Sequence, residues 1–125
     1  MPPKTPTPGH SVRGSTTGRP LMAALDLLGR RWALRLLWEL RNGPVGARDL
    51  RQRTDGMSSS VLYQRLGELG EAGLVAQQED SGQYTLTPAG AELGEALAPL
   101  DAWSDRWAIA LDSRSGSGPG SGPQP

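Results

Sequence analysis

The chain has 125 residues, no Cys and one His, and its 13 Lys and Arg residues equal its 13 Asp and Glu residues in number. Without Cys it cannot form a disulfide, a zinc finger or an iron-sulfur cluster, and its one His, His10, lies in a Pro- and Gly-rich segment. We therefore expect no catalytic residues, no metal site and no cofactor, and we expect that the protein is not an enzyme.

Both ends of the chain are poor in large apolar side chains. Residues 1–19 are rich in Pro, Gly, Ser and Thr, and residues 112–125 consist mostly of Gly, Ser and Pro. Such segments bury too little apolar surface to offset the entropy lost on ordering, so we expect disordered tails around one domain of residues 20–111. No apolar run has the length of a membrane span, and no hydrophobic signal core is present near the N-terminus. We expect a cytoplasmic protein that does not bind membranes.

The zero net charge hides an asymmetry along the chain. Residues 1–65 contain 11 Lys and Arg against 4 Asp and Glu, whereas residues 66–125 contain 2 against 9. The basic half favours a polyanionic partner. Because every basic residue except Lys4 is Arg, genome composition or ordinary solvated helix faces would also explain the excess.

Two helices are expected at the start of the domain. Residues 21–28 form an apolar, Ala-rich stretch that Gly29 terminates. A second helix ends at the Asn-Gly-Pro sequence of residues 42–44, and its apolar residues recur at helical spacing: Trp32, Leu36, Leu37 and Leu40. Trp32 and Trp38 lie on this most apolar helix, and we expect both in the core rather than in a ligand cage.

A short amphipathic helix and a turn follow. Residues 46–54 place Ala47 and Leu50 inward, with arginines around them at positions 48, 51 and 53. Asp55-Gly56 is a turn signal. Together these features predict a helix and a sharp turn directly before residue 58.

The next helix is predicted in most detail. Ser58 is expected to be its N-cap, because a Ser hydroxyl can accept a hydrogen bond from the first backbone N–H groups. Gly73 is expected to end it. Leu62, Leu66 and Leu69 share one buried face at spacings of four and three. At 100° per residue, the opposite face carries Ser60, Gln64 and Gly67, with Tyr63 on its flank.

A hairpin and a long helix complete the domain. Residues 74–78 and 83–87 have strand character, and a short loop at Asp80-Ser81-Gly82 joins them. Thr87-Pro88 combines a capping hydroxyl with a Pro at the first helical position. We expect the last helix to run from Pro88 to about Leu111.

This order of elements predicts a mostly helical α+β fold, a winged helix-turn-helix with a short β-hairpin wing and an additional C-terminal helix. In that fold the second helix of the turn enters the major groove of DNA and reads base edges with residues near its N-terminus. We therefore expect sequence-specific binding to double-stranded DNA. The candidate DNA-binding residues are Arg48, Arg51, Ser58, Ser59, Ser60, Tyr63, Gln64 and Arg65.

Several of these residues have a second interpretation. Capping alone would explain Ser58, and Tyr63 could be a half-buried flank of the core. Arg65 lies nearer the buried face and could reach either a phosphate or an acidic neighbour. Arg48 and Arg51 could simply occupy a solvated face.

The segments ALDLLGRRWALRLLWELRNGP, DGMSSSVLYQRLGELGEAGLV and YTLTPAGAELGEALAPLDAW resemble HxlR-type winged-helix transcriptional regulators, which are similar in architecture to MarR proteins. The resemblance covers about residues 20–108. It implies a homodimeric bacterial regulator in which the outer helices form the dimer contact and twin recognition helices read a palindromic operator. The candidate dimer residues are Leu21, Leu25, Leu97, Leu100, Trp103, Trp107 and Leu111.

The sequence also departs from that family. A Cys before the first helix is common in such regulators and is absent here, so we exclude thiol sensing. The segment between the strands is short and acidic, and Glu79 and Asp80 would be repelled by phosphates. This acidic segment leaves open an alternative function, a winged-helix protein-interaction module that does not bind DNA. A small-molecule effector between the Trp-bearing helices is also left open.

Overall fold

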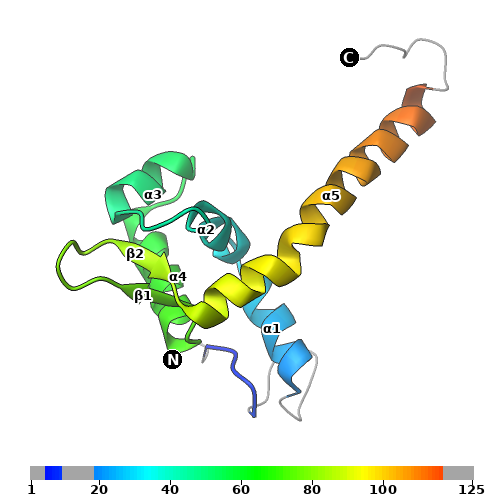
Figure 1. The fold of residues 1–125 in the computed structure, drawn as a ribbon. Coiled ribbons are helices and arrows are strands. Elements are labelled where there is room, and N and C mark those ends of the chain that lie inside the picture. Colours follow the sequence, from blue (N-terminus) through cyan, green and yellow to red (C-terminus); the bar gives the residue numbers. More distant parts are fainter. Residues whose placement is uncertain (1–4, 10–18, 117–125) are drawn as a thin grey trace. The chain divides into compact units, whose positions relative to one another are not determined.

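The computed structural model describes residues 5–9 and 19–116. Backbone contacts divide the chain into two compact units, residues 1–92 and 93–125. Figure 1 shows the elements in chain order: α1 (Pro20–Leu28), α2 (Ala33–Glu39), α3 (Ala47–Arg53), α4 (Ser59–Glu71), β1 (Val75–Gln77), β2 (Tyr84–Leu86) and α5 (Pro88–Gly116). This mostly helical α+β arrangement confirms the predicted winged helix-turn-helix.

The core of the first unit is built from leucines of three helices. The most completely buried of them come from α2, α3 and α4: Leu36, Leu40, Leu50, Leu62 and Leu69. The predicted buried face of α4 is thereby confirmed, since Leu66 is buried as well. Each fully buried Leu side chain contributes about 2 kcal/mol through removal of apolar surface from water. This core holds α4 against both α2 and α3.

The ends of α4 follow the prediction. The Ser58 Oγ accepts a hydrogen bond from the Val61 N–H at 3.2 Å, and Ser58 has an extended backbone with ψ of 159°. The helix ends at Glu71, and Gly73 then takes a φ of +78°. Because L-residues other than Gly rarely adopt such a φ, Gly73 allows the chain to turn directly into β1.

Trp32 departs from the prediction. It does not lie within α2 but precedes it, in a left-handed conformation with a φ of +77°. A side chain with a Cβ pays about 1–2 kcal/mol for this conformation. The Trp32 side chain is half-buried, so the expectation of a core residue is met only in part.

Trp38 also differs from the expectation of a core residue. It is 44% exposed, and the Arg41 guanidinium lies 3.6 Å from the centroid of its ring. The Arg41 Nη1 donates to the Trp38 carbonyl at 2.7 Å. The cation-π contact covers one ring face, which compensates in part for leaving an indole at the surface.

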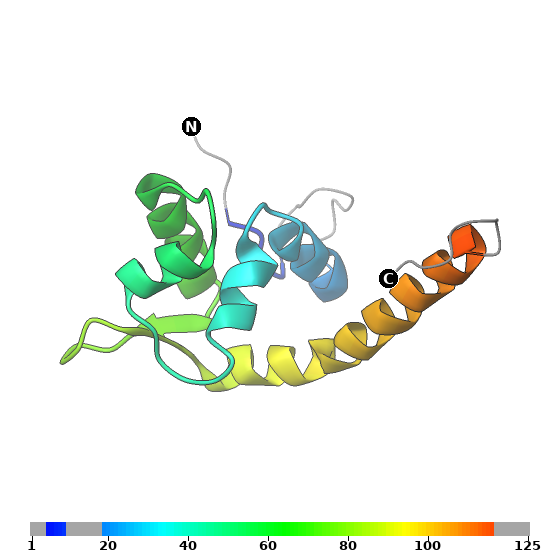
Figure 2. The same ribbon diagram turned by 90° about the horizontal axis from the view of Figure 1, so that it is seen from above.

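The hairpin is short and is tied to the chain before α3. β1 and β2 pair antiparallel with Val75 opposite Leu86 and Gln77 opposite Tyr84. Val45 and Tyr84 exchange two backbone hydrogen bonds of 2.9 Å, a contact that the sequence did not predict. In Figures 1 and 2 the loop between the strands projects away from α1 and α2, as a wing does.

The start of α5 is capped as predicted, because the Thr87 Oγ1 accepts from the Gly90 N–H at 3.1 Å. The same hydroxyl donates to the Gly73 carbonyl at 2.6 Å. Its end is not where the sequence placed it: the helix continues through Pro99 to Gly116, so the expected boundary at residue 112 falls inside α5.

The predicted N-terminal tail is partly structured. Within residues 5–9, Pro6 is buried and the Thr5 hydroxyl donates to the Glu71 carboxylate. The remainder of both predicted tails, residues 1–4, 10–18 and 117–125, lies outside the described residues. Among the helices of the described ranges, none has both the length and the apolar character of a membrane span.

Gly90 should tolerate no side chain. A Cβ at this position would lie 2.1 Å from the Leu74 carbonyl oxygen, which belongs to the backbone and cannot move aside easily. We expect Gly90→Ala to lower the free energy of unfolding by about 2 kcal/mol or more. Gly94→Ala, on the same helix, is the control, because nothing lies within 4 Å of its Cβ. Urea unfolding followed by circular dichroism should show the control unchanged or stabilised by up to about 1 kcal/mol.

Ser58→Ala should also destabilise the protein, by about 1 kcal/mol, because it removes the cap of α4. Ser59→Ala is the matched control, since the neighbouring hydroxyl caps nothing. Equal unfolding midpoints for the two variants would show that the Ser58 cap contributes nothing.

Candidate nucleic-acid interface

A hollow of about 510 Å³ lies between α3 and the start of α4. Ala47, Arg48, Arg51 and Gln52 of α3 and Ser59 and Tyr63 of α4 line it. Four of the predicted DNA-binding residues, two from each helix, are therefore brought together at one place. Their meeting depends on the packing of α3 against α4.

The two arginines of this hollow differ from the other arginines of α2 to α4. Within residues 5–9 and 19–116, neither the Arg48 nor the Arg51 side chain takes part in an ion pair or a hydrogen bond. By contrast, Arg35 and Arg53 both contact the Glu39 carboxylate. Arg48 and Arg51 are exposed, so their guanidinium groups can bind an external anion without breaking an existing contact.

The exposed face of α4 is the one that the helical periodicity of the sequence predicted. Ser60 and Gln64 are exposed, and Tyr63 is 54% exposed. The Ser58 and Ser60 hydroxyls lie 3.2 Å apart. About half of the Tyr63 surface is therefore accessible to a partner.

Arg65 has a different environment from the other candidates. Its Nη1 lies 3.1 Å from Glu68 Oε1, and its Nε donates to the Arg31 carbonyl at 2.8 Å. Only 17% of its side chain is exposed. Of the two partners considered for Arg65, a phosphate or an acidic neighbour, the structure shows the acidic neighbour. Arg65 does not line the hollow.

Glu68 of α4 forms ion pairs with two arginines, a role that the sequence did not predict. Its Oε2 lies 2.7 Å from Arg30 Nη1, and its other oxygen contacts Arg65. The carboxylate is nearly buried, with 11% of the side chain exposed. The spacing of Arg65 and Glu68 by three residues signals an intrahelical pair, but no local pattern identifies Arg30 as the third member.

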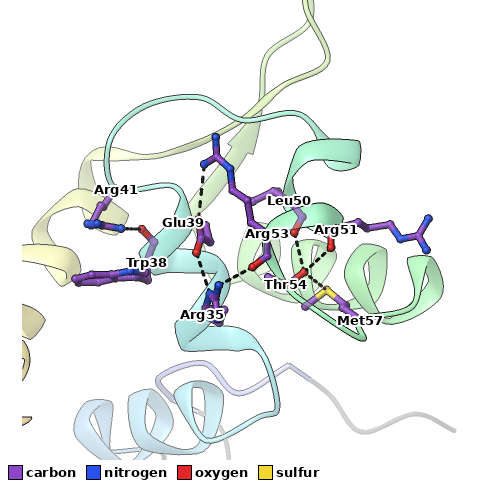
Figure 3. Close-up of polar contacts among 9 residues, drawn as sticks. All are labelled: Arg35, Trp38, Glu39, Arg41, Leu50, Arg51, Arg53, Thr54 and Met57. Carbon is purple, nitrogen blue, oxygen red and sulfur yellow. Dashed lines mark hydrogen bonds and ion pairs between the residues drawn. The ribbon is translucent and has the colours of Figure 1, made fainter. Parts of the chain in front are cut away.

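A second polar network orients α3 (Figure 3). Glu39 accepts from Arg35 Nε at 2.9 Å and lies 3.7 Å from Arg53 Nη1. Arg35 Nη2 in turn donates to the Arg53 carbonyl at 2.5 Å. Through these contacts, Glu39 and Arg35 of α2 hold Arg53 at the C-terminal end of α3.

The turn from α3 to α4 is fixed by Thr54, which is fully buried. Its Oγ1 donates to the Leu50 carbonyl at 2.7 Å and lies 3.8 Å from Met57 Sδ (Figure 3). Sequence reasoning placed Thr54 at the end of a helix but did not detect its role. Because a buried hydroxyl must find a partner, Thr54 specifies the geometry of the turn.

Tyr63 lies close enough to the hairpin to affect Tyr84. Burial raises the pKa of the Tyr84 phenol above its usual value of 10.0, and Tyr63 raises it further. A phenol is neutral at physiological pH even at its usual pKa, so the raised pKa delays the ionisation of Tyr84 only at alkaline pH.

The hairpin itself offers no positive charge. Residues 74–87 contain no Lys or Arg, and Glu79 and Asp80 at the tip are exposed. In the part of the chain that the structure describes, no group of three or more His, Cys, Asp or Glu residues could hold a metal ion.

The candidate dimer residues are mostly exposed, and they lie in both units. Leu21 and Leu25 of the first unit are 68% and 54% exposed. In the second unit the Trp103 and Trp107 rings stack with their centroids 5.3 Å apart. Leu100 and Leu111 are exposed and Leu97 is partly exposed.

Several known proteins resemble this chain in sequence and in fold. The HxlR-like helix-turn-helix family model matches residues 27–112. The HTH-type transcriptional regulator YodB of Bacillus subtilis is 29% identical over 99 residues, which cover 75% of this chain and 88% of YodB. The quinone-bound crystal structure of YodB has a TM-score of 0.64 at 30% identity and covers 69% of this chain and 96% of that one.

A MarR-family transcriptional regulator from Enterococcus faecalis V583 has the same TM-score, 0.64, at 33% identity, with 70% of this chain and 84% of that chain covered. The relatives are named as regulators, which confirms the expectation of a regulator rather than an enzyme. The family match covers more than half of the chain and contains the hollow, α4 and the hairpin. The chain belongs to the HxlR-like helix-turn-helix family of transcriptional regulators.

Proposed function

We propose that this regulator binds a palindromic operator in double-stranded DNA, sequence-specifically and as a homodimer, in the cytoplasm of a bacterium. The observation that carries the proposal is that Arg48 and Arg51, which form no ion pair within residues 5–9 and 19–116, lie beside the exposed start of α4. Base-edge donors and phosphate-binding cations then lie on one surface, which is what a helix-turn-helix needs to dock in a major groove.

In the proposed complex the front of α4 enters the major groove. Ser58, Ser59 and Ser60 begin the helix, and Tyr63 and Gln64 follow in the next turn. The free N–H groups at this end favour a phosphate oxygen. A Gln side chain can bind adenine through two hydrogen bonds, and Ser tolerates several partners. Gln64 is therefore the foremost candidate for base discrimination.

Arg65 is not part of this proposed interface. Its guanidinium is held by Glu68 and the Arg31 carbonyl, and moving it to DNA would leave the nearly buried Glu68 carboxylate with one cation fewer. Its proposed role is to set the position of α4.

The proposed dimer contact uses the exposed apolar residues of α1 and α5. Two stacked indoles in water are costly for a small domain, and a second copy of the chain would bury them. A two-fold dimer presents two copies of α4, so the operator would have two half-sites about 34 Å apart.

Gln64→Ala and Arg51→Ala should affect DNA binding in different ways. Gln64→Ala should reduce discrimination against a wrong base by about tenfold or more, because a bidentate contact to a base edge is lost. Arg51→Ala should weaken binding to all sequences alike and reduce the slope of log affinity against log salt by about 2, because the dimer loses one phosphate contact in each half-site. Titrations of operator and random duplexes at two salt concentrations measure both effects.

Equal losses for both variants on operator and random DNA would contradict this division of roles. Failure of the wild-type protein to shift the DNA flanking its own gene, or any duplex selected from a random library, would contradict the proposed function and favour the protein-interaction module.

Trp107→Ala should convert the dimer to monomer. Truncation of a central interface aromatic costs about 2 kcal/mol or more, so the dissociation constant should rise at least about 30-fold in sedimentation equilibrium. Ile109→Ala is the control, since Ile109 is 67% exposed but lies two residues away on a different face of α5. A monomeric wild-type protein at micromolar concentration would contradict the dimer.

A further inference from the structure

We propose that the hollow between α3 and α4 seats one sugar-phosphate unit of the DNA backbone, held by Arg48, Arg51 and the hydroxyls of Ser59 and Tyr63. This inference rests on the proposed function and divides the front of α4 between two roles. Ser59 and Tyr63 would bind phosphate, and only Ser60 and Gln64 would read bases.

The two roles follow from the spacing of these residues on α4. Residues four apart lie on one face of a helix, so Ser59 and Tyr63 form one row and Ser60 and Gln64 form the next. The row of Ser59 and Tyr63 lines the hollow beside α3, whereas neither Ser60 nor Gln64 does. The bases would therefore meet the second row, and the backbone would pass along the first.

The lining of the hollow fits an anionic backbone better than a small apolar ligand. Small-molecule sites are lined mainly by apolar and aromatic side chains. Here Ala47 is the one aliphatic contributor, and the other lining residues carry a guanidinium, an amide or a hydroxyl. Among the residues that the structure describes, no Asp or Glu lines the hollow, so none of its lining side chains would repel a phosphate.

The two guanidinium groups supply the charge. Arg48 and Arg51 are three residues apart on α3 and so lie on the same side of the helix, where like charges repel each other slightly. Neither has an acidic partner within the described ranges. A phosphate between them would relieve the repulsion and accept charge-assisted hydrogen bonds from both.

The decisive variant is Tyr63→Phe, which keeps the ring and removes only the hydroxyl. The affinity of the dimer should fall about 100-fold, because each half-site loses one hydrogen bond to a charged group at a cost of about tenfold. The factor should be the same on a duplex selected from a random library and on an unrelated duplex. The base preferences found by selection should not change. An unchanged melting temperature establishes that the fold is intact.

Replacing single phosphates with uncharged methylphosphonates should locate the phosphate that Tyr63 contacts. A series of selected duplexes, each with a methylphosphonate at the same position of both half-sites, should contain one position at which wild-type affinity drops and at which Tyr63→Phe causes no further loss. Gln64→Ala is the control: it should change base preference and keep its full sensitivity to the same methylphosphonate. Arg41→Ala is the charge control, since Arg41 stacks on Trp38 and does not line the hollow.

The outcomes separate this inference from the proposed function. A changed base preference in Tyr63→Phe, an affinity equal to that of the wild type, or additive losses at every methylphosphonate would overturn the phosphate seat while DNA binding stands. If the wild-type protein binds no duplex at all, the proposed function and the seat are both wrong.

Discussion

The nearly buried carboxylate of Glu68 is the constraint on which the position of α4 depends. It lies between Arg30, in the segment that joins α1 to α2, and Arg65 on its own helix. Removing one cation would leave a poorly solvated charge, which is strongly unfavourable in a protein interior. Arg65 also binds the Arg31 carbonyl, directly before the left-handed Trp32. The direction of α4 and the strained turn between the first two helices are therefore fixed by the same guanidinium.

Two polar networks within the first unit engage four of its arginines. Glu68 binds Arg30 and Arg65 behind α4, and Glu39 binds Arg35 and Arg53 beside α3. Four of the eleven basic residues in the first half of the chain thus form ion pairs within the described part of the fold. The unengaged positive charge that lines the hollow is concentrated on one helix, next to the hydroxyl-bearing start of α4.

The features that the sequence predicted are those that depend on residues close together in the chain. The leucine face of α4, the Ser58 cap and the Thr87 cap follow from helical spacing and from the chemistry of helix ends, and the structure contains all three. The expectation of a buried Trp38 was wrong, because at 100° per residue Trp38 lies opposite the stripe of Leu36, Leu37 and Leu40, where Arg41 covers one face of its ring. The outward placement of Gln64 was predictable for the same reason as the leucine face. The hollow was not, because it exists only once Thr54 and the core set α3 against α4.

The acidic tip of the hairpin affects how such a regulator would be distributed on a chromosome. Binding to arbitrary DNA comes from cations that displace counterions from the backbone, and each missing contact weakens it. Because Glu79 and Asp80 are exposed at its tip, the hairpin would add no such contact, and binding of the regulator to non-specific DNA would be weaker. A larger share of the molecules would stay in free solution, and occupancy of the target would respond more closely to the number of copies in the cell.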